Sequence, residues 1–181
     1  GVAHRVDRYD VTADIPAKRR LKDRADVTVI DPRDEFTFVP SLIWVPFGKR
    51  DANDVTFPLE PVFRKRGIRF LHATAQRFDL DRQIVETDHG DVAYDRLVVA
   101  TGPRLAFERI PGLGPHGGHT QAVCTLDHTL ATRDAWQQYL KNPGPVVVGT
   151  AQGGSCFGAS YEFLLNTRYQ LEQAGLGDQP V

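Results

Sequence analysis

The chain has 181 residues and a formal net charge of −1; 41% of its residues are hydrophobic and 25% are charged. This composition is ordinary for a globular protein and argues against a long disordered, collagen-like or mucin-like chain. The balanced charge gives no electrostatic reason to expect a nucleic-acid partner, and no stretch reaches the roughly 18 apolar residues of a membrane-spanning helix. Two cysteines are too few for a disulfide scaffold. Because the sequence contains no methionine, we expect an excerpt of a longer polypeptide.

The first half of the chain predicts mainly short strands. After a highly charged segment, residues 1–25, the run 25–31 has the β-branched pattern of a buried strand and stops at Pro32. Residues 32–61 are expected to form a long connection with little regular structure, and loops of that length are usually functional. A short helix is expected at 61–66. The strands expected after it are 68–73, 75–80, 83–87, 91–93 and 96–100, with a hairpin turn at Asp88-His89-Gly90.

The second half predicts two helices. Residues 111–119, rich in glycine and proline, are expected to be an exposed connection. Helical spacing over 129–141 ends at Pro143-Gly144-Pro145, and a strand at 146–148, a glycine-rich turn and a helix over 155–174 follow. Apolar strands separated by helices indicate an α/β fold with a mainly parallel, Rossmann-like sheet, and the hairpin indicates a small antiparallel β layer.

The glycine-rich turn is close to a dinucleotide-binding fingerprint. It runs from Gly149 to Gly154, directly between the predicted strand and the last helix. Glycines in this position let backbone amides approach a phosphate at the helix N-terminus. Ala151 adds a methyl group where the second glycine of the pattern should lie. A tight turn that binds no nucleotide explains the motif equally well.

Two strand ends also suggest a nucleotide fold. Asp31 lies at the C-terminal end of a predicted strand, which is where a Rossmann unit holds a ribose hydroxyl, but no glycine lies between Gly1 and Gly48. A solvated strand end is the better interpretation of Asp31 in isolation. The strand over 96–100 closes on Thr101 and Gly102, which places a small, permissive residue where a backbone passes near something bulky. This second signal is weak by itself.

The two cysteines are the remaining chemical signal. Cys156 is expected in the first turn of the last helix, where a thiolate would be stabilised and nucleophilic. Cys124 lies upstream, followed by Asp127 and His128. Two buried structural cysteines are the alternative. A zinc site is not favoured, because the spacing of the available ligands matches no common site. Those ligands are His116, His119, Cys124 and His128.

Together these features resemble the sulfide:quinone oxidoreductases, a branch of the two-dinucleotide-domain flavoproteins. The Ala-Thr-Gly strand end and the glycine turn are shared across that class. The two cysteine motifs are more specific, because relatives that oxidise NADH have no need of them. The stretches that carry the resemblance are Val27–Pro32, Phe38–Ser41, Trp44–Gly48, Tyr94–Pro103, Cys124–His128 and Gly154–Glu162.

The resemblance implies bound FAD, oxidation of sulfide to zero-valent sulfur or polysulfide, and reduction of a membrane quinone. Cys156 would be a redox cysteine near the flavin that carries the growing sulfur chain, and Cys124 would be an additional cysteine. His128 and Glu162 would handle protons near Cys124 and Cys156, respectively. The residues implied to lie along the cofactor are Asp31, which would face the adenosine ribose, Pro40, Thr101 and Gly102.

The resemblance also implies a domain organisation and a location. Residues 26–142 would be a partial FAD-binding domain and 143–181 the start of a second dinucleotide-binding-like domain, after an atypical segment, 1–25, without the glycine fingerprint. The chain would be an N-terminal fragment of a peripheral enzyme of the bacterial cell membrane, attached through C-terminal elements, with homo-oligomerisation left open and the fragment itself expected in solution. The alternatives are the flavin subunit of a flavocytochrome c sulfide dehydrogenase, an NADH:quinone oxidoreductase, and a non-catalytic Rossmann-like binding module.

Overall fold

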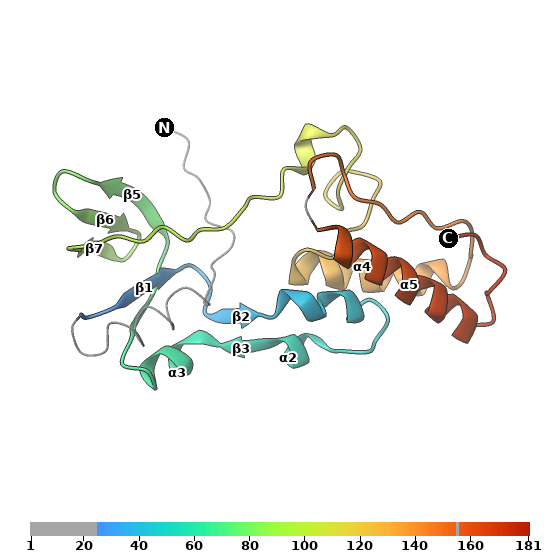
Figure 1. Ribbon diagram of the computed structural model, residues 1–181, viewed down its shortest axis with the longest axis horizontal. Coiled ribbons are helices and arrows are strands. Elements are labelled where there is room, and N and C mark those ends of the chain that lie inside the picture. The colour runs from blue at the N-terminus through green and yellow to red at the C-terminus, as the bar shows by residue number, and fades with distance from the viewer. Residues whose placement is uncertain (1–24, 155) are drawn as a thin grey trace. The chain divides into compact units, whose positions relative to one another are not determined.

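The computed structural model describes residues 25–154 and 156–181 (Figure 1). These residues divide into two compact units. Unit 1 holds the described residues up to Phe36 together with Phe57–Ala106, and unit 2 holds Thr37–Thr56 and Phe107–Val181. The predicted atypical segment 1–25 lies outside the described residues apart from Ala25. The domain boundary predicted at residue 142 stays a prediction.

Unit 1 contains the predicted parallel pairing. β1 (Thr28–Asp31) lies parallel to β4 (Arg69–His72), with Val29 opposite Phe70. The segment between them includes the helix α3 (Leu59–Arg64), because parallel strands need a long crossover. The combination of a parallel sheet, helices and a small antiparallel sheet confirms the α/β class predicted from the sequence.

A small apolar core holds the sheet and helix of unit 1 together. Leu59 and Phe63 lie on one side of α3 and pack against Val29 of β1 and Ile68, which precedes β4. Phe63 is fully buried, and its ring stacks on Phe70 with the ring centroids 5.5 Å apart. Burying these side chains is the main force that holds α3 against the sheet, because a six-residue helix is not stable alone.

The antiparallel layer forms where the turn signal predicts it. β5 (Ala75–Asp79), β6 (Ile84–Thr87) and β7 (Gly90–Ala93) pair in that order. The hydroxyl of Thr87 donates to the carbonyl of Gly90 at 2.6 Å and closes the turn. Gly90 has φ +109, a conformation that a side chain disfavours. The predicted hairpin is therefore confirmed.

The expectation of little regular structure over 32–61 is wrong. This stretch contains β2 (Glu35–Thr37), the 3-10 helix η2 (Val39–Trp44), α2 (Ala52–Val55) and β3 (Thr56–Pro58), with β2 paired to β3. Its prolines do not prevent helix formation, because proline is tolerated in the first turn of a helix. Apolar residues of this stretch and of the later helix α4 form the core of unit 2: Leu42, Val45, Val55, Leu126 and Leu130.

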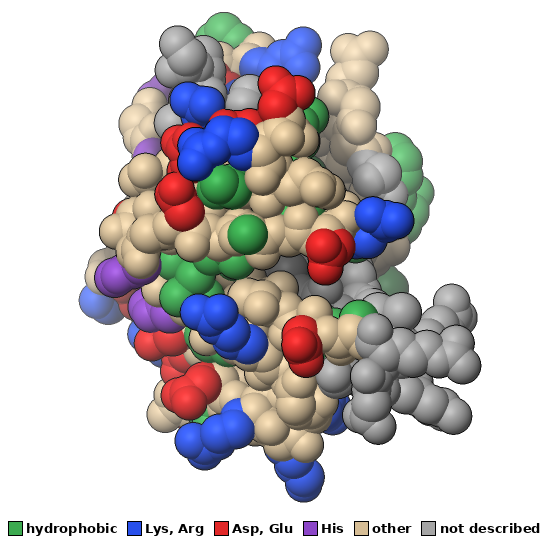
Figure 2. Space-filling view, turned by 90° about the vertical axis from the view of Figure 1, so that its left-hand side faces the viewer, with side chains coloured by type: hydrophobic (Ala, Val, Ile, Leu, Met, Phe, Trp, Pro, Cys, Tyr) green, Lys and Arg blue, Asp and Glu red, His purple; other side chains and the backbone are tan. Residues whose placement is uncertain are grey.

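Two long helices complete unit 2, close to their predicted positions. They are α4 (Leu126–Tyr139) and α5 (Phe157–Gln173). Phe47 lies between them, because its ring stacks on Phe163 of α5 and meets the edge of Trp136 of α4, with both centroid distances 5.2 Å. None of the described helices is long and apolar enough to cross a membrane. On the face shown in Figure 2, basic and acidic side chains are interspersed.

The strands predicted at 96–100 and 146–148 are wrong. Both stretches have irregular backbone, with the Val98 side chain 74% exposed and that of Val147 93% exposed. A strand requires a partner for its backbone groups, and no strand among the described residues pairs with either stretch. The N–H of Val146 instead donates to the carbonyl of Pro180 at 3.0 Å.

The core of unit 1 predicts that two leucine substitutions have different effects on stability. Leu59 is 2% exposed and Leu80 is 71% exposed. We expect Leu59→Ala to lower the free energy of unfolding by about 2–5 kcal/mol, whereas the matched control Leu80→Ala should change it by less than about 0.5 kcal/mol. Urea unfolding followed by circular dichroism measures both. Equal effects of the two substitutions would contradict the packing of α3.

Asp88 gives a prediction for acid pH. The N–H of Thr74 donates to Asp88 Oδ1 at 2.7 Å and holds the pKa of this carboxyl below its ordinary 3.8. A depressed pKa stabilises the fold above the unfolded pKa, and this contribution is lost as pH falls through the folded pKa. We expect Asp88→Asn to be less stable than wild type at pH 7, with the difference shrinking below about pH 4. Urea unfolding over this pH range measures the difference, and one that stays constant would contradict the assignment.

Candidate functional site

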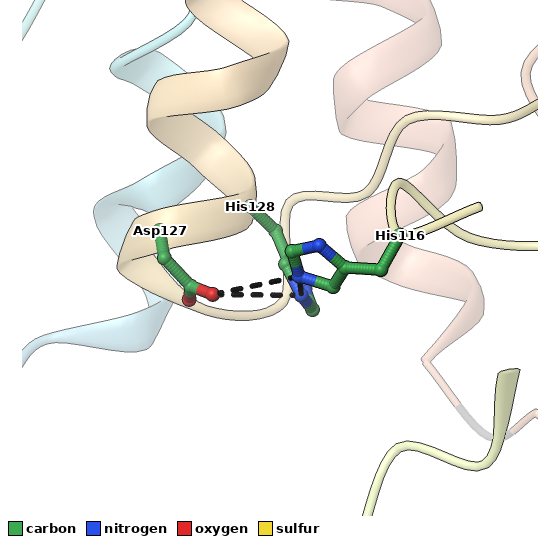
Figure 3. A group of neighbouring side chains, drawn as sticks. All are labelled: His116, Asp127 and His128. Carbon is green, nitrogen blue, oxygen red and sulfur yellow. Dashed lines mark hydrogen bonds and ion pairs between the residues drawn. The ribbon is translucent and has the colours of Figure 1, made fainter. Parts of the chain in front are cut away.

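The N-termini of α4 and α5 lie at the same end of unit 2 (Figures 1 and 3). Cys156 is the N-cap residue of α5, and Cys124 immediately precedes Thr125, the N-cap residue of α4. Neither cysteine is part of a disulfide and both are exposed, so the alternative of buried structural cysteines does not apply. The structure therefore brings the two predicted redox cysteines to one end of one unit.

The start of α4 places His128 in the interior. The Thr125 hydroxyl accepts from the N–H of His128 at 3.4 Å, and the Thr129 hydroxyl donates to the Thr125 carbonyl at 2.7 Å. These contacts satisfy groups that the first helical turn leaves unpaired. His128 is only 6% exposed, and Phe107 meets the edge of its ring at a centroid distance of 5.4 Å.

His128 contacts a second histidine and an aspartate (Figure 3). Its Nε2 atom lies 3.0 Å from Nε2 of His116, so one ring donates and the other accepts. Asp127 Oδ2 lies 3.6 Å from His128 Nε2 and 3.9 Å from His116 Nε2. Partial burial raises the pKa of Asp127, but the hydrogen bond with the Thr125 side chain and the charge of His128 outweigh it. The pKa therefore lies below its ordinary 3.8.

The loop that carries His116 is tightly folded. The N–H of Gly114 donates to the Thr120 hydroxyl, and the N–H of His119 donates to the Gly112 carbonyl, both at 2.8 Å. A Cβ atom at Gly118 would lie 2.3 Å from the Gly114 carbonyl oxygen, so only glycine fits there. Most of this loop is exposed, as predicted, but Gly114 is buried. The sequence placed His116 and His128 among the available zinc ligands, in a site that the spacing did not favour, and it did not include Asp127. The clustered glycines are the signal that could have indicated the close approach of the two histidines.

The backbone of the turn before α5 itself explains why glycine is present there. Gly153 has φ +84, and a Cβ atom at Gly154 would lie 2.6 Å from the Thr150 methyl carbon. The N–H of Gly154 donates to the Ala151 carbonyl at 2.9 Å, within the turn itself. The need for glycine at these positions therefore arises without a phosphate. Glu162, the other predicted residue of this helix, is exposed on α5.

Asp31 lies in unit 1 with other predicted cofactor residues. Its side chain is 1% exposed, which excludes the solvated strand end considered from the sequence. Arg33 holds both of its oxygens: the backbone N–H and Nε donate to Oδ1 at 2.8 and 3.1 Å, and Nη2 donates to Oδ2 at 3.1 Å. Thr101 and Gly102 lie in irregular backbone of the same unit, and Gly102 has φ +65. Pro40 is exposed in η2 of unit 2.

Comparison with known proteins shows what the chain is similar to. The chain is 37% identical over 159 residues, 87% of its length, to the sulfide-quinone reductase of Aquifex aeolicus. The X-ray structure of the sulfide:quinone oxidoreductase from this bacterium matches with a TM-score of 0.80 and 36% identity over 90% of the chain. Over most of its own length the chain is therefore similar to sulfide:quinone oxidoreductases. It spans 36% of the length of that reductase and 37% of the crystallised chain.

Other known proteins match the chain with lower identity. A type II NADH:quinone oxidoreductase of Staphylococcus haemolyticus is 32% identical over 85 residues, 47% of the chain and 21% of that protein. A ferredoxin reductase of Rhodopseudomonas palustris matches over 86% of the chain and 37% of its own, with a TM-score of 0.63 and 21% identity, which shows a shared fold alone. No protein-family model matches the chain.

The exposure of the cysteines gives a prediction for thiol chemistry. Since both Cys124 and Cys156 are exposed, we expect a thiol-specific chromogenic disulfide to titrate both thiols in the folded chain. The same number should be titrated after unfolding in urea. If fewer thiols react in the folded chain than in the unfolded chain, a helix N-terminus is covered in solution. That result would contradict the placement of the cysteine that does not react.

Proposed function

We propose that this chain is part of an FAD-dependent enzyme that oxidises sulfide and reduces a membrane quinone. The proposal is carried by the two exposed cysteines at one end of unit 2, in a chain similar to a sulfide-quinone reductase over most of its length. In this reaction hydrosulfide loses two electrons and one proton, and the quinone takes up two electrons and two protons. One further proton therefore comes from solvent, and residues that move protons are needed.

Cys156 is the proposed acceptor of the sulfur atom. Its thiol is exposed at the N-cap of a 17-residue helix and makes no capping hydrogen bond. The helix N-terminus favours an anionic group at this place. Hydrosulfide is a soft nucleophile that can attack a disulfide between Cys156 and a second cysteine: the new S–S bond leaves Cys156 as a persulfide, and the second cysteine leaves as a thiolate. The two electrons released when the cysteine pair is oxidised again would be taken up by FAD when it is bound. Cys124, at the start of α4, is the proposed additional cysteine in handling the sulfur chain.

His128 and Glu162 are the proposed proton carriers. His128 is buried beside the N-cap of α4, and its ring exchanges a hydrogen bond with the exposed ring of His116. This contact connects a buried ring nitrogen to a side chain that reaches water. Glu162 is exposed on α5, the helix that begins at Cys156. General acid–base groups of these two types are common in enzymes.

Unit 1 contains residue types that commonly contact a flavin nucleotide. A carboxylate at the carboxyl end of a parallel strand is where dinucleotide folds receive a ribose hydroxyl. Asp31 occupies that position in β1, but its side chain is buried and Arg33 bonds to both of its oxygens, so a ribose hydroxyl would have to replace part of the Arg33 contact. Thr101, Gly102 and Pro40 are the other residues proposed to lie along FAD. When bound, FAD supplies two-electron chemistry that side chains lack.

One observation supports a second candidate function, the oxidation of NADH. The similarity to a type II NADH:quinone oxidoreductase allows NADH as the electron donor. That similarity covers 47% of the chain, compared with 87% for the sulfide-quinone reductase, and NADH oxidation gives no role to Cys156. Sulfide is therefore the better-supported donor. The quinone acceptor is common to both candidates, and attachment to the membrane surface is proposed with it.

The proposal is tested by Cys156→Ser in the native protein. We expect sulfide-dependent reduction of decylubiquinone to fall at least about 100-fold, because serine forms no disulfide or persulfide. The flavin absorbance and circular dichroism spectrum should be unchanged. Quinone reduction is followed by its ultraviolet absorbance, with NADH as a second donor that should give no rate.

Glu172→Gln is the matched control on α5. Glu172 is exposed and bonds to Arg168 on the surface, so its substitution should leave the rate unchanged. Unaltered sulfide oxidation by Cys156→Ser would exclude the proposed role of this cysteine. Quinone reduction by NADH would favour the second candidate, and electron transfer to a haem protein instead of quinone would favour a flavocytochrome-type enzyme.

A further inference from the structure

A cluster of two histidines and one aspartate lies at the N-terminus of α4. The cluster consists of His116, Asp127 and His128, whose side chains point toward one another (Figure 3). We propose that these three residues form a binding site for one divalent transition-metal ion of the Zn²⁺ type. The proposal concerns binding alone and does not depend on sulfide oxidation.

The separations of the three ligand atoms suit zinc. The two Nε2 atoms are 3.0 Å apart, and Asp127 Oδ2 lies 3.6 and 3.9 Å from them. A point equidistant from the corners of this triangle lies about 2 Å from each atom, close to the Zn–N and Zn–O bond lengths of roughly 2.0–2.2 Å. Small adjustments of the exposed Asp127 and His116 side chains allow an ion to sit above the plane with a water as fourth ligand.

The scaffold around the cluster limits how far these ligands move. His128 is buried in the first turn of α4, between Phe107 and His116. His116 comes from the loop in which Gly118 leaves no room for a side chain. The two imidazoles therefore approach each other before any ion binds, which lowers the cost of assembling the site.

The ligand types determine which ion is favoured. Two imidazole nitrogens and one carboxylate suit Zn²⁺ and related transition metals, whereas Mg²⁺ and Ca²⁺ prefer oxygen ligands. The buried Nδ1 atom of His128 makes no hydrogen bond within the described part of the chain. A ligand histidine usually donates from this second nitrogen, and its absence weakens binding about 10–100-fold. We therefore expect weaker binding than at a zinc site whose ligand histidines each donate from the second nitrogen.

Metal binding and proton transfer would compete at His128. A metal ion takes up the Nε2 lone pairs of both histidines, and this removes the hydrogen bond between the two rings. A zinc ion bound here would therefore block the proposed proton path without touching either cysteine. This consequence rests on the proposed function, but the binding itself is measured without turnover.

Calorimetric titration of the purified 181-residue chain with ZnCl₂ tests the proposal. We expect saturation at one ion per chain. His116→Ala and Asp127→Asn should each weaken binding about ten-fold or more. His119→Ala is the matched control, since it removes an exposed histidine three residues from His116 that does not belong to the cluster, and it should bind as wild type does. Circular dichroism verifies that each variant is folded.

Cobalt identifies the ligands independently. Co²⁺ in a nitrogen–oxygen site shows visible bands without the thiolate charge-transfer band in the ultraviolet. We expect the nitrogen–oxygen spectrum, and its loss in His116→Ala. The proposal is overturned by the absence of saturable binding, by equal weakening in His119→Ala, or by a thiolate band, which would assign the ion to a cysteine instead.

Discussion

The candidate site depends on one interaction, the packing of η2 and the residues that follow it, up to Phe47, against α4 and α5. Leu42 and Val45 are fully buried and contact Leu126 and Leu130 of α4, and Phe47 contacts both helices. With both helices held against one segment, their N-termini lie at the same end of unit 2. Each N-terminus carries a cysteine, and the buried histidine follows the first of them. The chemistry at this end is therefore positioned by apolar contacts that contain none of the reactive groups.

Features that depend on neighbouring residues were predictable from the sequence. The strand β1 followed from a β-branched run stopped by proline, and the hairpin from Asp88-His89-Gly90. The helices α4 and α5 followed from apolar spacing. In each case nearby residues supply most of the information, through turn conformation or through one apolar face. The position of Cys156 at a helix N-terminus followed in the same way.

Features that depend on distant partners were not predictable. The valine-rich stretches 96–100 and 146–148 have strand propensity, but β propensity is realised only where a neighbouring strand accepts the pairing. The contact between His116 and His128 joins a loop to a helix twelve residues further along the chain, and it depends on the path of a glycine-rich backbone. The sequence indicated Asp31 as a candidate because it ends a predicted strand. Its burial and its bonds to Arg33 depend on the folded chain and could not be predicted from the sequence.

The exposed valines have a consequence for the behaviour of the chain in concentrated solution. Val98, Val99 and Val147 present β-branched side chains to water at 74, 58 and 93% exposure, on backbone that joins no strand in the described part of the chain. Exposed stretches with this β propensity can pair between copies of a chain if they become extended. A surface that covers these valines would therefore remove apolar area from water and lower the tendency of the chain to self-associate.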